Sequence, residues 1–315
     1  MNCRHCHTKI TNVFVDLGQS PPSNSYLSKD ELHKLEINYP LKVFVCHECF
    51  LVQLNEYKPH NEIFTQDYAY FSSFSTTWLK HAHDYVESIT NKLKLGKHSY
   101  VTEIASNDGY LLKNFIKKGI PCVGVEPTKN TAEVAKSKGI EVVEDFFSLQ
   151  LAQRLKKSNL IICNNVLAHV PDINDFVKGL KILLENGGTI TVEFPHLLNL
   201  IKLFQFDTIY HEHYSYLSLY TSKIIFNYFG LEIYDVEKIN THGGSLRLYC
   251  KHLNDSSIQQ SESVEKIINE EIDFGLNKLS SYSNFISEVL EIKNKTLDFL
   301  RNAKKENKKV IAYGA

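Results

Sequence analysis

Residues 100–127, "YVTEIASNDGYLLKNFIKKGIPCVGVEP", decide the fold class of this chain. The runs "YVTEIA" and "PCVGVEP" have the composition of short buried strands, and a segment with helical spacing opens near Tyr110 between them. Two strands that are separated by a helix form a βαβ unit, whose strands lie parallel in one sheet. We therefore expect an α/β domain built on a parallel sheet.

The same alternation continues on the C-terminal side of this unit. The strand candidates "LIICNN" and "TITVEF" follow, and helices open near Thr131 and Asp172. The runs "LEIYDVEKI" and "GSLRLYCKH" come next with no long helix between them, which predicts an antiparallel hairpin that closes the sheet. Residues 255–305 are polar and helical, and "NKKVIAYGA" at the end reads as one more strand that runs into a glycine turn.

Length and composition limit the class of protein. The 315 residues suggest two or three structural units, and 43% hydrophobic residues are enough for sizeable cores. The net charge of −1 provides no general attraction to nucleic acid or to anionic membranes. The N-terminus lacks the apolar segment of a signal peptide, and no apolar run approaches the roughly 20 residues of a membrane span. We expect a cytoplasmic protein with reduced cysteines.

Four of the seven cysteines are arranged as a metal site. "CRHC" and "CHEC" place Cys3, Cys6, Cys46 and Cys49 in two C-x2-C pairs, and two such turns can complete a tetrahedral set of four thiolates. Because four thiolates leave no position open for substrate, we expect a structural zinc ion. Unligated buried cysteines are the alternative. A zinc-dependent nucleic-acid module needs a basic face, but residues 1–60 hold six basic and six acidic side chains.

The loop after the first strand of the sheet, "EIASNDGYLL", is suited to a ligand. Its small residues let the backbone approach closely, and Gly109 permits a turn that side chains would block. The second strand ends at Glu126, about 20 residues after Glu103, where an acid can accept the two hydroxyls of a ribose. Asp145 and Phe146 close the third strand, where they can bind and stack on adenine, and the fourth strand ends at Asn164. A structural α/β fold with stray carboxylates is the alternative.

An acidic loop indicates which adenosine ligand binds. A dinucleotide needs a glycine-rich turn cleared for pyrophosphate, whereas this loop carries Ser106, Asn107 and Asp108, and a carboxylate repels phosphate. S-adenosylmethionine, with its cationic sulfonium, suits such a loop better, which favours a methyltransferase over a dehydrogenase. The predicted cofactor-binding residues are Glu103, Ala105, Ser106, Asn107, Gly109, Glu126, Pro127, Asp145, Phe146 and Asn164.

Residues 210–216, "YHEHYSY", gather two histidines, one glutamate and three tyrosines. In an extended segment His211 and His213 would point the same way, which could suit a metal ion as well as acid–base chemistry. An aromatic loop with solvated histidines is the third interpretation. The stretch alone leaves these three alternatives open.

The chain as a whole resembles the sugar-nucleotide C-methyltransferases, which methylate C-3 of dTDP-linked 4-keto-deoxysugars. The matching stretches run in order through the chain: "CRHC" and "CHEC" with "FLVQL", then "DYAYFSSFS", "EIASNDGYLL", "VGVEPTKN", "NNVLAHVPD", "VEFPHL", "YHEHYSYLSL" and "THGGSLRLY". One departure is Ala105, where the family more often has glycine.

The resemblance implies a class I methyltransferase Rossmann-like fold, a seven-stranded sheet with a small N-terminal zinc-binding module and a helical C-terminal extension. We expect the zinc-binding module at residues 1–60, a helical substrate-side segment at 61–98 and the S-adenosylmethionine-binding domain at 99–254. A helical linker would occupy 255–308. Residues 309–315 would be the first strand of a C-terminal α/β domain of which the rest is missing.

The resemblance also implies roles in the acceptor site. It assigns the base to His213 and further substrate contacts to Tyr210, Glu212, His169 and a tyrosine of "DYAYF", which we place at Tyr70 with Tyr68 as the alternative. In this scheme His213 removes the C-3 proton, and Glu212 orients a histidine or holds the substrate. Tyr210, Tyr70 or His169 would donate to the enolate oxygen that develops.

The resulting hypothesis is an S-adenosylmethionine-dependent C-methyltransferase that acts on a nucleotide-linked 4-keto-deoxysugar. O- or N-methylation of a small metabolite is one alternative, and a truncated fragment that binds the cofactor without turnover is another. We expect no nucleic-acid or membrane partner, and a monomer or weak oligomer.

Overall fold

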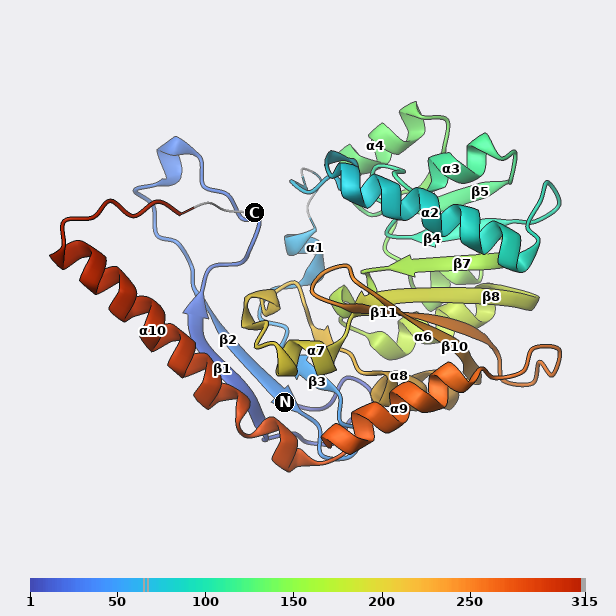
Figure 1. Cartoon of the computed structure of the whole chain (residues 1–315). Helices are drawn as coiled ribbons and strands as arrows, with labels where there is room; N and C mark the ends of the chain where they lie inside the picture. Colours follow the sequence, from blue (N-terminus) through green and yellow to red (C-terminus); the bar gives the residue numbers. More distant parts are fainter. Residues whose placement is uncertain (65, 67, 313–315) are drawn as a thin grey trace.

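The computed structural model describes residues 1–64, 66 and 68–312. Its larger sheet has seven strands in the order β10-β11-β8-β7-β4-β5-β6 (Figure 1). In chain order these strands are β4 (Val101–Ile104), β5 (Cys122–Val125), β6 (Glu141–Val143), β7 (Ser158–Asn164), β8 (Leu184–Pro195), β10 (Leu231–Ile239) and β11 (Ser245–His252).

The pairing of these strands confirms the predicted sheet. β4 lies parallel to both β5 and β7, and β7 lies parallel to β8. β11 is antiparallel to β8 and to β10, so the hairpin expected at the end of the domain closes the sheet on one side. The fold is the class I methyltransferase Rossmann-like fold, with its mixed seven-stranded sheet.

Helices cover both faces of this sheet because its central strands alternate their side chains. In β7, Leu160 and Ile162 pack in one core with α2 and α3, whereas Ile161 and Cys163 pack in the other with α5, α6 and α8. The helices are α2 (Thr76–Leu93), α3 (Leu112–Lys117), α4 (Lys129–Ser137), α5 (Leu149–Ala152), α6 (Ile173–Leu183), α7 (Leu197–Lys202) and α8 (Leu219–Tyr228).

The helix starts follow the local sequence. Ser75 caps α2 by accepting a hydrogen bond from the backbone of Trp78, and Asp172 caps α6 in the same way through Asp175. Both caps are polar residues that precede an amphipathic run, and the one at Asp172 confirms the helix start predicted there. The predicted helix near Tyr110 begins slightly later, at Leu112.

A second sheet of four strands, in the order β1-β2-β3-β9, forms the N-terminal module. β1 (Val13–Ser20), β2 (Tyr39–Val45) and β3 (Val52–Leu54) come from the first 60 residues, and the short α1 (His60–Ile63) follows them. The fourth strand, β9 (Ser215–Tyr216), comes from the end of "YHEHYSY" and pairs with β3. Residues that the sequence assigned to the central domain therefore complete the N-terminal sheet.

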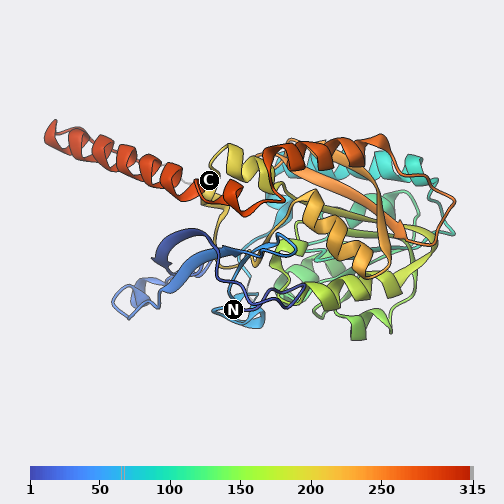
Figure 2. The same cartoon turned by 90° about the horizontal axis from the view of Figure 1, so that it is seen from below.

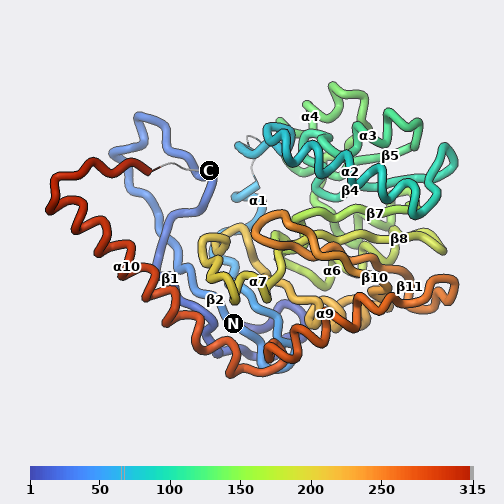
Figure 3. Tube along the Cα trace, in the orientation of Figure 1, coloured from blue at the N-terminus to red at the C-terminus, as the bar shows by residue number. Residues whose placement is uncertain are grey.

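The C-terminal part is helical, as predicted. α9 (Glu262–Phe274) packs beside the large sheet, and α10 (Phe285–Lys305) begins on β1, where Phe285 stacks on Phe14 with ring centroids 4.6 Å apart. The rest of α10 extends away from the body of the molecule (Figures 2 and 3). Residues 309–312 form no strand, and 313–315 lie outside the described residues, so the predicted last strand stays a prediction. Among the described helices, none is both long enough and apolar enough to cross a bilayer.

Candidate active site

A cavity of about 560 Å³ opens at the carboxyl ends of β4, β5 and β7. Parallel strands end at the same edge of a sheet, so the residues that follow them converge there. Glu126 and Phe146 line the cavity, and we call the part that the residues after the strands line the donor end. Tyr210, Glu212 and His213 also line it, and we call their part the acceptor end. The two sets of residues that the sequence singled out separately thus share one space.

The turn after β4 has an unusual backbone. Ala105 and Asn107 adopt left-handed conformations, with φ of 57° and 49°, and Gly109 follows with φ of 74°. A Cβ atom on Gly109 would lie 2.3 Å from Cδ1 of Ile140, so only glycine fits this position. The strained conformation at Ala105 explains physically why glycine is the residue better suited there.

Glu126 is buried at the end of β5 and organises this turn. Its Oε2 accepts from the backbone nitrogen of Asn107 at 2.8 Å, and its Oε1 accepts from the backbone nitrogen of Thr128 at 2.9 Å and from the Thr128 hydroxyl. Burial raises the pKa of Glu126, against these hydrogen bonds, which lower it. The carboxylate lines the cavity with acceptor capacity left on Oε2, as the predicted ribose contact requires.

Three predicted cofactor residues lie behind the cavity wall. Glu103, Ser106 and Gly109 are not among its lining residues, unlike Ala105, Asn107, Pro127 and Asn164. Gly109 and Ser106 shape the turn from behind it. Both carboxylate oxygens of Glu103 are buried and accept no hydrogen bond from any described residue. Burial, followed by the charges of Glu126 and Asp108, raises the pKa of Glu103 well above its ordinary value.

Asp145 and Phe146 line the donor end, although β6 stops at Val143, just before them. The backbone nitrogen of Phe146 donates to Oδ1 of Asp145 at 2.8 Å, which fixes the turn. The ring of His60, from the N-terminal module, meets the ring of Phe146 edge-on at a centroid distance of 4.6 Å. Two modules therefore contribute to this aromatic part of the cavity lining, and the adenine contact of Phe146 stays a prediction.

His213 lies at the acceptor end with a defined tautomer. Its Nδ1 donates to the carbonyl oxygen of Thr208 at 3.0 Å, so its Nε2 carries a lone pair, which accepts from the Tyr210 hydroxyl at 2.8 Å. Burial, and then the neighbouring His169, lower the pKa of His213 well below its ordinary value. The imidazole is therefore neutral at neutral pH, which is the form that a general base requires.

Glu212 does not orient a histidine through its carboxylate. Its Oε1 accepts from Oγ of Ser23 at 3.0 Å and from Nδ2 of Asn24 at 2.8 Å, and its Oε2 accepts from the Tyr68 hydroxyl at 3.2 Å. The backbone oxygen of Glu212 is what contacts a histidine, since Nδ1 of His169 donates to it at 3.0 Å. Glu212 therefore ties the loop at residues 23–24 to the acceptor end.

His169 and Tyr70 both line the cavity, as predicted. The rings of His169 and His213 meet edge-on with centroids 4.7 Å apart, and burial lowers the pKa of His169. Tyr70 is half exposed, and its backbone oxygen accepts from Nδ2 of Asn107 at 3.1 Å. Tyr68, the alternative, is the tyrosine that reaches Glu212.

His211 has a separate structural role. Residues 211–212 form a turn rather than an extended segment, so His211 and His213 do not face the same way. Nε2 of His211 donates to the carbonyl oxygen of Tyr39 at 3.2 Å, and this histidine does not line the cavity. The two histidines consequently do not form the metal pair that an extended strand would have allowed.

The four predicted cysteines converge in the N-terminal module. Their sulfur atoms all lie within 4.8 Å of one another, with Cys3 and Cys49, and Cys6 and Cys46, each 3.5 Å apart. Zinc–sulfur bonds of about 2.3 Å place tetrahedral sulfurs about 3.8 Å apart, so this donor set fits the ion. The contact with Cys49 lowers the pKa of Cys3 to about 4. When bound, zinc would stabilise the fold of the module. Its role would be structural because four thiolates leave no coordination position open for a substrate.

Three protein-family models match consecutive parts of the chain. Residues 3–64 match the model described as "Putative zinc binding domain", residues 78–236 match "Methyltransferase domain", and residues 240–315 match "C-methyltransferase C-terminal domain". The second of these covers half of the chain and the whole of the cofactor turn.

The chain belongs to the methyltransferase family. The three models in this order identify it as an S-adenosylmethionine-dependent C-methyltransferase.

Relatives of this methyltransferase differ in how much of it they cover. C-methyltransferase NovU of Streptomyces niveus is 29% identical over 318 residues, which cover 99% of this chain and 75% of that protein. The ubiquinone biosynthesis O-methyltransferase of Actinobacillus pleuropneumoniae serotype 5b (strain L20) is 28% identical over 117 residues, 34% of this chain and 49% of that one. An S-adenosylmethionine-dependent methyltransferase structure from Clostridium acetobutylicum ATCC 824 matches at a TM-score of 0.46 and 14% identity, over 55% of this chain and 92% of that one.

Several residues of the methyltransferase cavity were not found from the sequence. His60, Trp78 and His242 line it, and Asn24 does so from the loop between β1 and β2. His242 lies in the stretch "THGGSLRLY", for which no site residue was predicted from the sequence, and His60 and Asn24 belong to no motif. The contribution of His60 and Asn24 arises from the packing of the N-terminal module on the methyltransferase domain, which no local pattern encodes.

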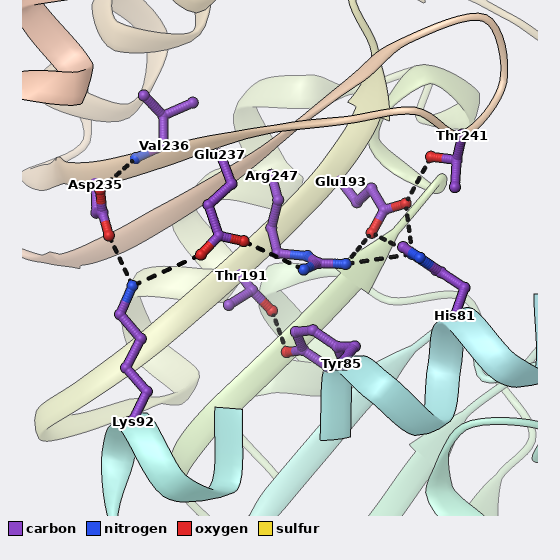
Figure 4. Close-up of polar contacts among 10 residues, drawn as sticks. All are labelled: His81, Tyr85, Lys92, Thr191, Glu193, Asp235, Val236, Glu237, Thr241 and Arg247. Atoms are coloured by element: carbon purple, nitrogen blue, oxygen red, sulfur yellow. Dashed lines mark hydrogen bonds and ion pairs between the residues drawn. The ribbon is translucent and has the colours of Figure 1, made fainter. Parts of the chain in front are cut away.

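A buried polar network supports one wall of the methyltransferase cavity (Figure 4). Glu193, fully buried near the end of β8, accepts from Arg247 at 2.9 Å, from Nε2 of His81 at 3.1 Å and from the Thr241 hydroxyl at 3.2 Å. Burial would raise the pKa of Glu193, but these partners lower it overall. The network holds His81, and the ring of Trp78 stacks on the ring of His81 with their centroids 4.8 Å apart. Through Thr241 it also holds the loop that carries His242.

Proposed function

We propose that this methyltransferase transfers the methyl group of S-adenosylmethionine to C-3 of a nucleotide-linked 4-keto-deoxysugar. C-methyltransferase NovU matches 99% of the chain, and a model described as "C-methyltransferase C-terminal domain" matches its C-terminal part. The reaction at carbon requires a base, a carbonyl group that stabilises the resulting carbanion, and a methyl donor on the same side.

One observation carries this proposal. The unprotonated Nε2 of His213 lies in a cavity that Tyr70 and the predicted ribose acceptor Glu126 also line. A neutral imidazole in one cavity with a hydroxyl that can donate is suited to form an enolate, since the base takes a proton while the hydroxyl stabilises the developing oxyanion. Methylation of a hydroxyl or amine has less need of that combination.

The roles of the side chains follow from their positions. Nε2 of His213 takes the C-3 proton, and the electrons of that C–H bond move into the enolate. The hydroxyl of Tyr70 would donate to the enolate oxygen. Neutral His169 would not, because its Nδ1 carries the proton donated to the oxygen of Glu212 and its Nε2 carries a lone pair. S-adenosylmethionine supplies the electrophilic methyl group, and Glu126 with the turn at residues 105–109 would hold its adenosine part.

Tyr210 determines how the proton reaches His213. Its hydroxyl donates a hydrogen bond to Nε2 of His213 at 2.8 Å, so the lone pair that would take the C-3 proton is already engaged. Either the sugar displaces this hydroxyl, or the hydroxyl passes the proton on. In Tyr210→Phe, exchange that persists would support displacement, and exchange lost to the level of His213→Ala would support passage through the phenol.

Solvent exchange tests the proposal directly. The protein is incubated with a dTDP-4-keto-deoxysugar in heavy water, and deuterium at C-3 is followed by NMR with and without S-adenosylmethionine. We expect exchange in the wild type and a fall of about 10²- to 10⁴-fold in His213→Ala, the usual contribution of a general base. The matched control is His98→Ala, which changes a histidine outside the cavity-lining set.

The alternatives predict different results. An O- or N-methyltransferase has no reason to exchange a carbon-bound proton, so transfer of the methyl group without exchange would refute the enolate route. Exchange that survives in His213→Ala would assign the base to another residue. Binding of S-adenosylmethionine with neither exchange nor transfer would indicate an inactive fragment.

A further inference from the structure

Arg4 lies between two metal-binding cysteines, yet its side chain reaches the methyltransferase domain. Its Nη1 donates to the carbonyl oxygen of Pro171 at 2.7 Å, and its Nη2 donates to that of Leu54 at 2.8 Å. Its guanidinium carbon also lies 4.9 Å from the centre of the Tyr214 ring. Pro171 lines the cavity, Leu54 ends β3, and Tyr214 directly follows His213.

The backbone of Arg4 is connected to the cysteine cluster through one side chain. Gln53, fully buried in β3, accepts from the backbone nitrogen of Arg4 through Oε1 at 2.9 Å. Its Nε2 donates to the sulfur of Cys3 at 3.3 Å. Gln53 therefore sets the position of Arg4 relative to a metal-binding sulfur.

The other end of this connection is the segment that carries His213. The backbone nitrogen of Leu54 donates to the oxygen of Tyr214 at 2.9 Å, and the nitrogen of Tyr214 donates to the oxygen of Ala168 at 2.8 Å. Ala168 lines the cavity next to His169. Tyr214 is thus held between the N-terminal sheet and the cavity wall, directly beside the proposed base.

We propose that Arg4 is a positioning residue that couples the four-cysteine site to the imidazole of His213. The inference rests on the proposed function in so far as His213 is the base. One guanidinium bridges two carbonyl oxygens and covers an aromatic ring, a combination that its planar fork permits and an ammonium group does not. The contacts form a contiguous physical network, and their coupling can be measured.

The experiment compares Arg4→Met with Arg301→Met in the full chain. Arg301 is exposed on α10 and serves as the matched control. Bound zinc per chain is measured by metal analysis, S-adenosylmethionine affinity by calorimetry, and the ring nitrogens of His213 by ¹⁵N NMR, assigned by their absence in His213→Gln. The C-3 exchange rate is measured in parallel.

We expect Arg4→Met to retain its zinc and to bind S-adenosylmethionine within about twofold of the wild type. The His213 ring signals should shift, and exchange should fall about 10- to 100-fold, the range expected when a positioned base is misplaced. Arg4→Lys keeps the charge and can keep one of the two hydrogen bonds, so we expect an intermediate exchange rate. Arg301→Met should match the wild type in every measurement.

Two results would overturn the inference. In the first, Arg4→Met keeps its zinc while the His213 signals superimpose on those of the wild type. In the second, both Arg4 variants lose zinc or fail to fold, which would make Arg4 a structural part of the metal module. Absence of exchange in the wild type would count against the proposed function, whereas the NMR comparison would still decide the role of Arg4.

Discussion

The donor and acceptor ends of the cavity are built in different ways. The donor end consists mainly of residues that follow β4, β5, β6 and β7 in one domain, and the N-terminal module adds His60 beside Phe146. The acceptor end combines the loop before β9 with Asn24, Tyr68 and His242, which come from distant parts of the chain. The donor end follows largely from strand order, whereas the acceptor end exists only where the N-terminal module packs on the methyltransferase domain.

This difference indicates how the two ends should respond to substitutions and to removal of the metal. The turn at the donor end is held by Glu126 and by the core of the large sheet. The acceptor end depends on β9, which pairs with β3 of the cysteine module. The first two predictions below perturb one end and ask whether the other is spared, and the last two measure how the donor end contributes to stability.

Loss of the metal should have the largest effect. Structural zinc contributes roughly 10 kcal/mol or more to the folding of small metal modules. Removal by a chelator, or Cys46→Ser, should therefore reduce C-3 exchange by at least about 100-fold, with a much smaller loss of S-adenosylmethionine affinity. Calorimetry and exchange on the same samples test this. If C-3 exchange and S-adenosylmethionine affinity fell by the same factor, the two ends of the cavity would not be supported separately.

Glu126→Gln should produce the opposite pattern. Hydrogen bonds to a charged group contribute about 1.5–3 kcal/mol, so S-adenosylmethionine affinity should fall about 10- to 100-fold. The His213 ring signals should stay unchanged. Glu133→Gln, at an exposed site on α4, is the control for loss of one carboxylate. Unchanged affinity in Glu126→Gln would remove Glu126 from the cofactor site.

Glu103→Gln should stabilise the protein at neutral pH. The raised pKa of Glu103 means that the folded state favours its protonated form, so the wild-type carboxyl destabilises the fold increasingly as pH rises above the unfolded value of about 4.5. The gain in unfolding free energy should thus be small near pH 5 and reach about 1–3 kcal/mol near pH 7.5. Denaturant unfolding at both pH values measures it. A gain that does not grow with pH would contradict the assignment.

Ala105→Gly should have the smallest effect. A left-handed backbone costs a non-glycine residue about 1–2 kcal/mol, of which the entropy of glycine in the unfolded chain offsets part. We expect a net gain of up to about 1 kcal/mol in the free energy of unfolding. Ala132→Gly, inside α4, should lose about 1 kcal/mol instead. If both substitutions lowered the free energy of unfolding, the conformation of the turn at Ala105 would not be strained.

Much of the fold could be read from local pattern. Apolar runs separated by amphipathic segments predicted the large sheet and its closing hairpin, because side-chain alternation and helical spacing are properties of neighbouring residues. The same reasoning predicted the cofactor turn, since residues after parallel strands share one edge. It also placed Glu103, Ser106 and Gly109 in the binding set, although none of the three lines the cavity.

The acceptor end could be anticipated only by resemblance. "YHEHYSY" marked the right segment but left open which side chains face the cavity. The carboxylate of Glu212 bonds to Ser23 and Asn24, which lie almost 190 positions earlier, and such a contact leaves no trace in local spacing. His211 was free to pair with His213 until the turn at residues 211–212 directed it toward Tyr39.

The sequence by itself determined the sheet, the strand-end acids and the four-sulfur donor set, because each depends on spacing between near neighbours or on a pair of tight turns. Only the tertiary structure decided which tautomer His213 adopts, what Tyr210 and Glu212 bind, and that β9 joins the cysteine module. Those features depend on hydrogen bonds and burial between segments that are brought together solely by folding, so their physical cause lies outside any local stretch of the chain.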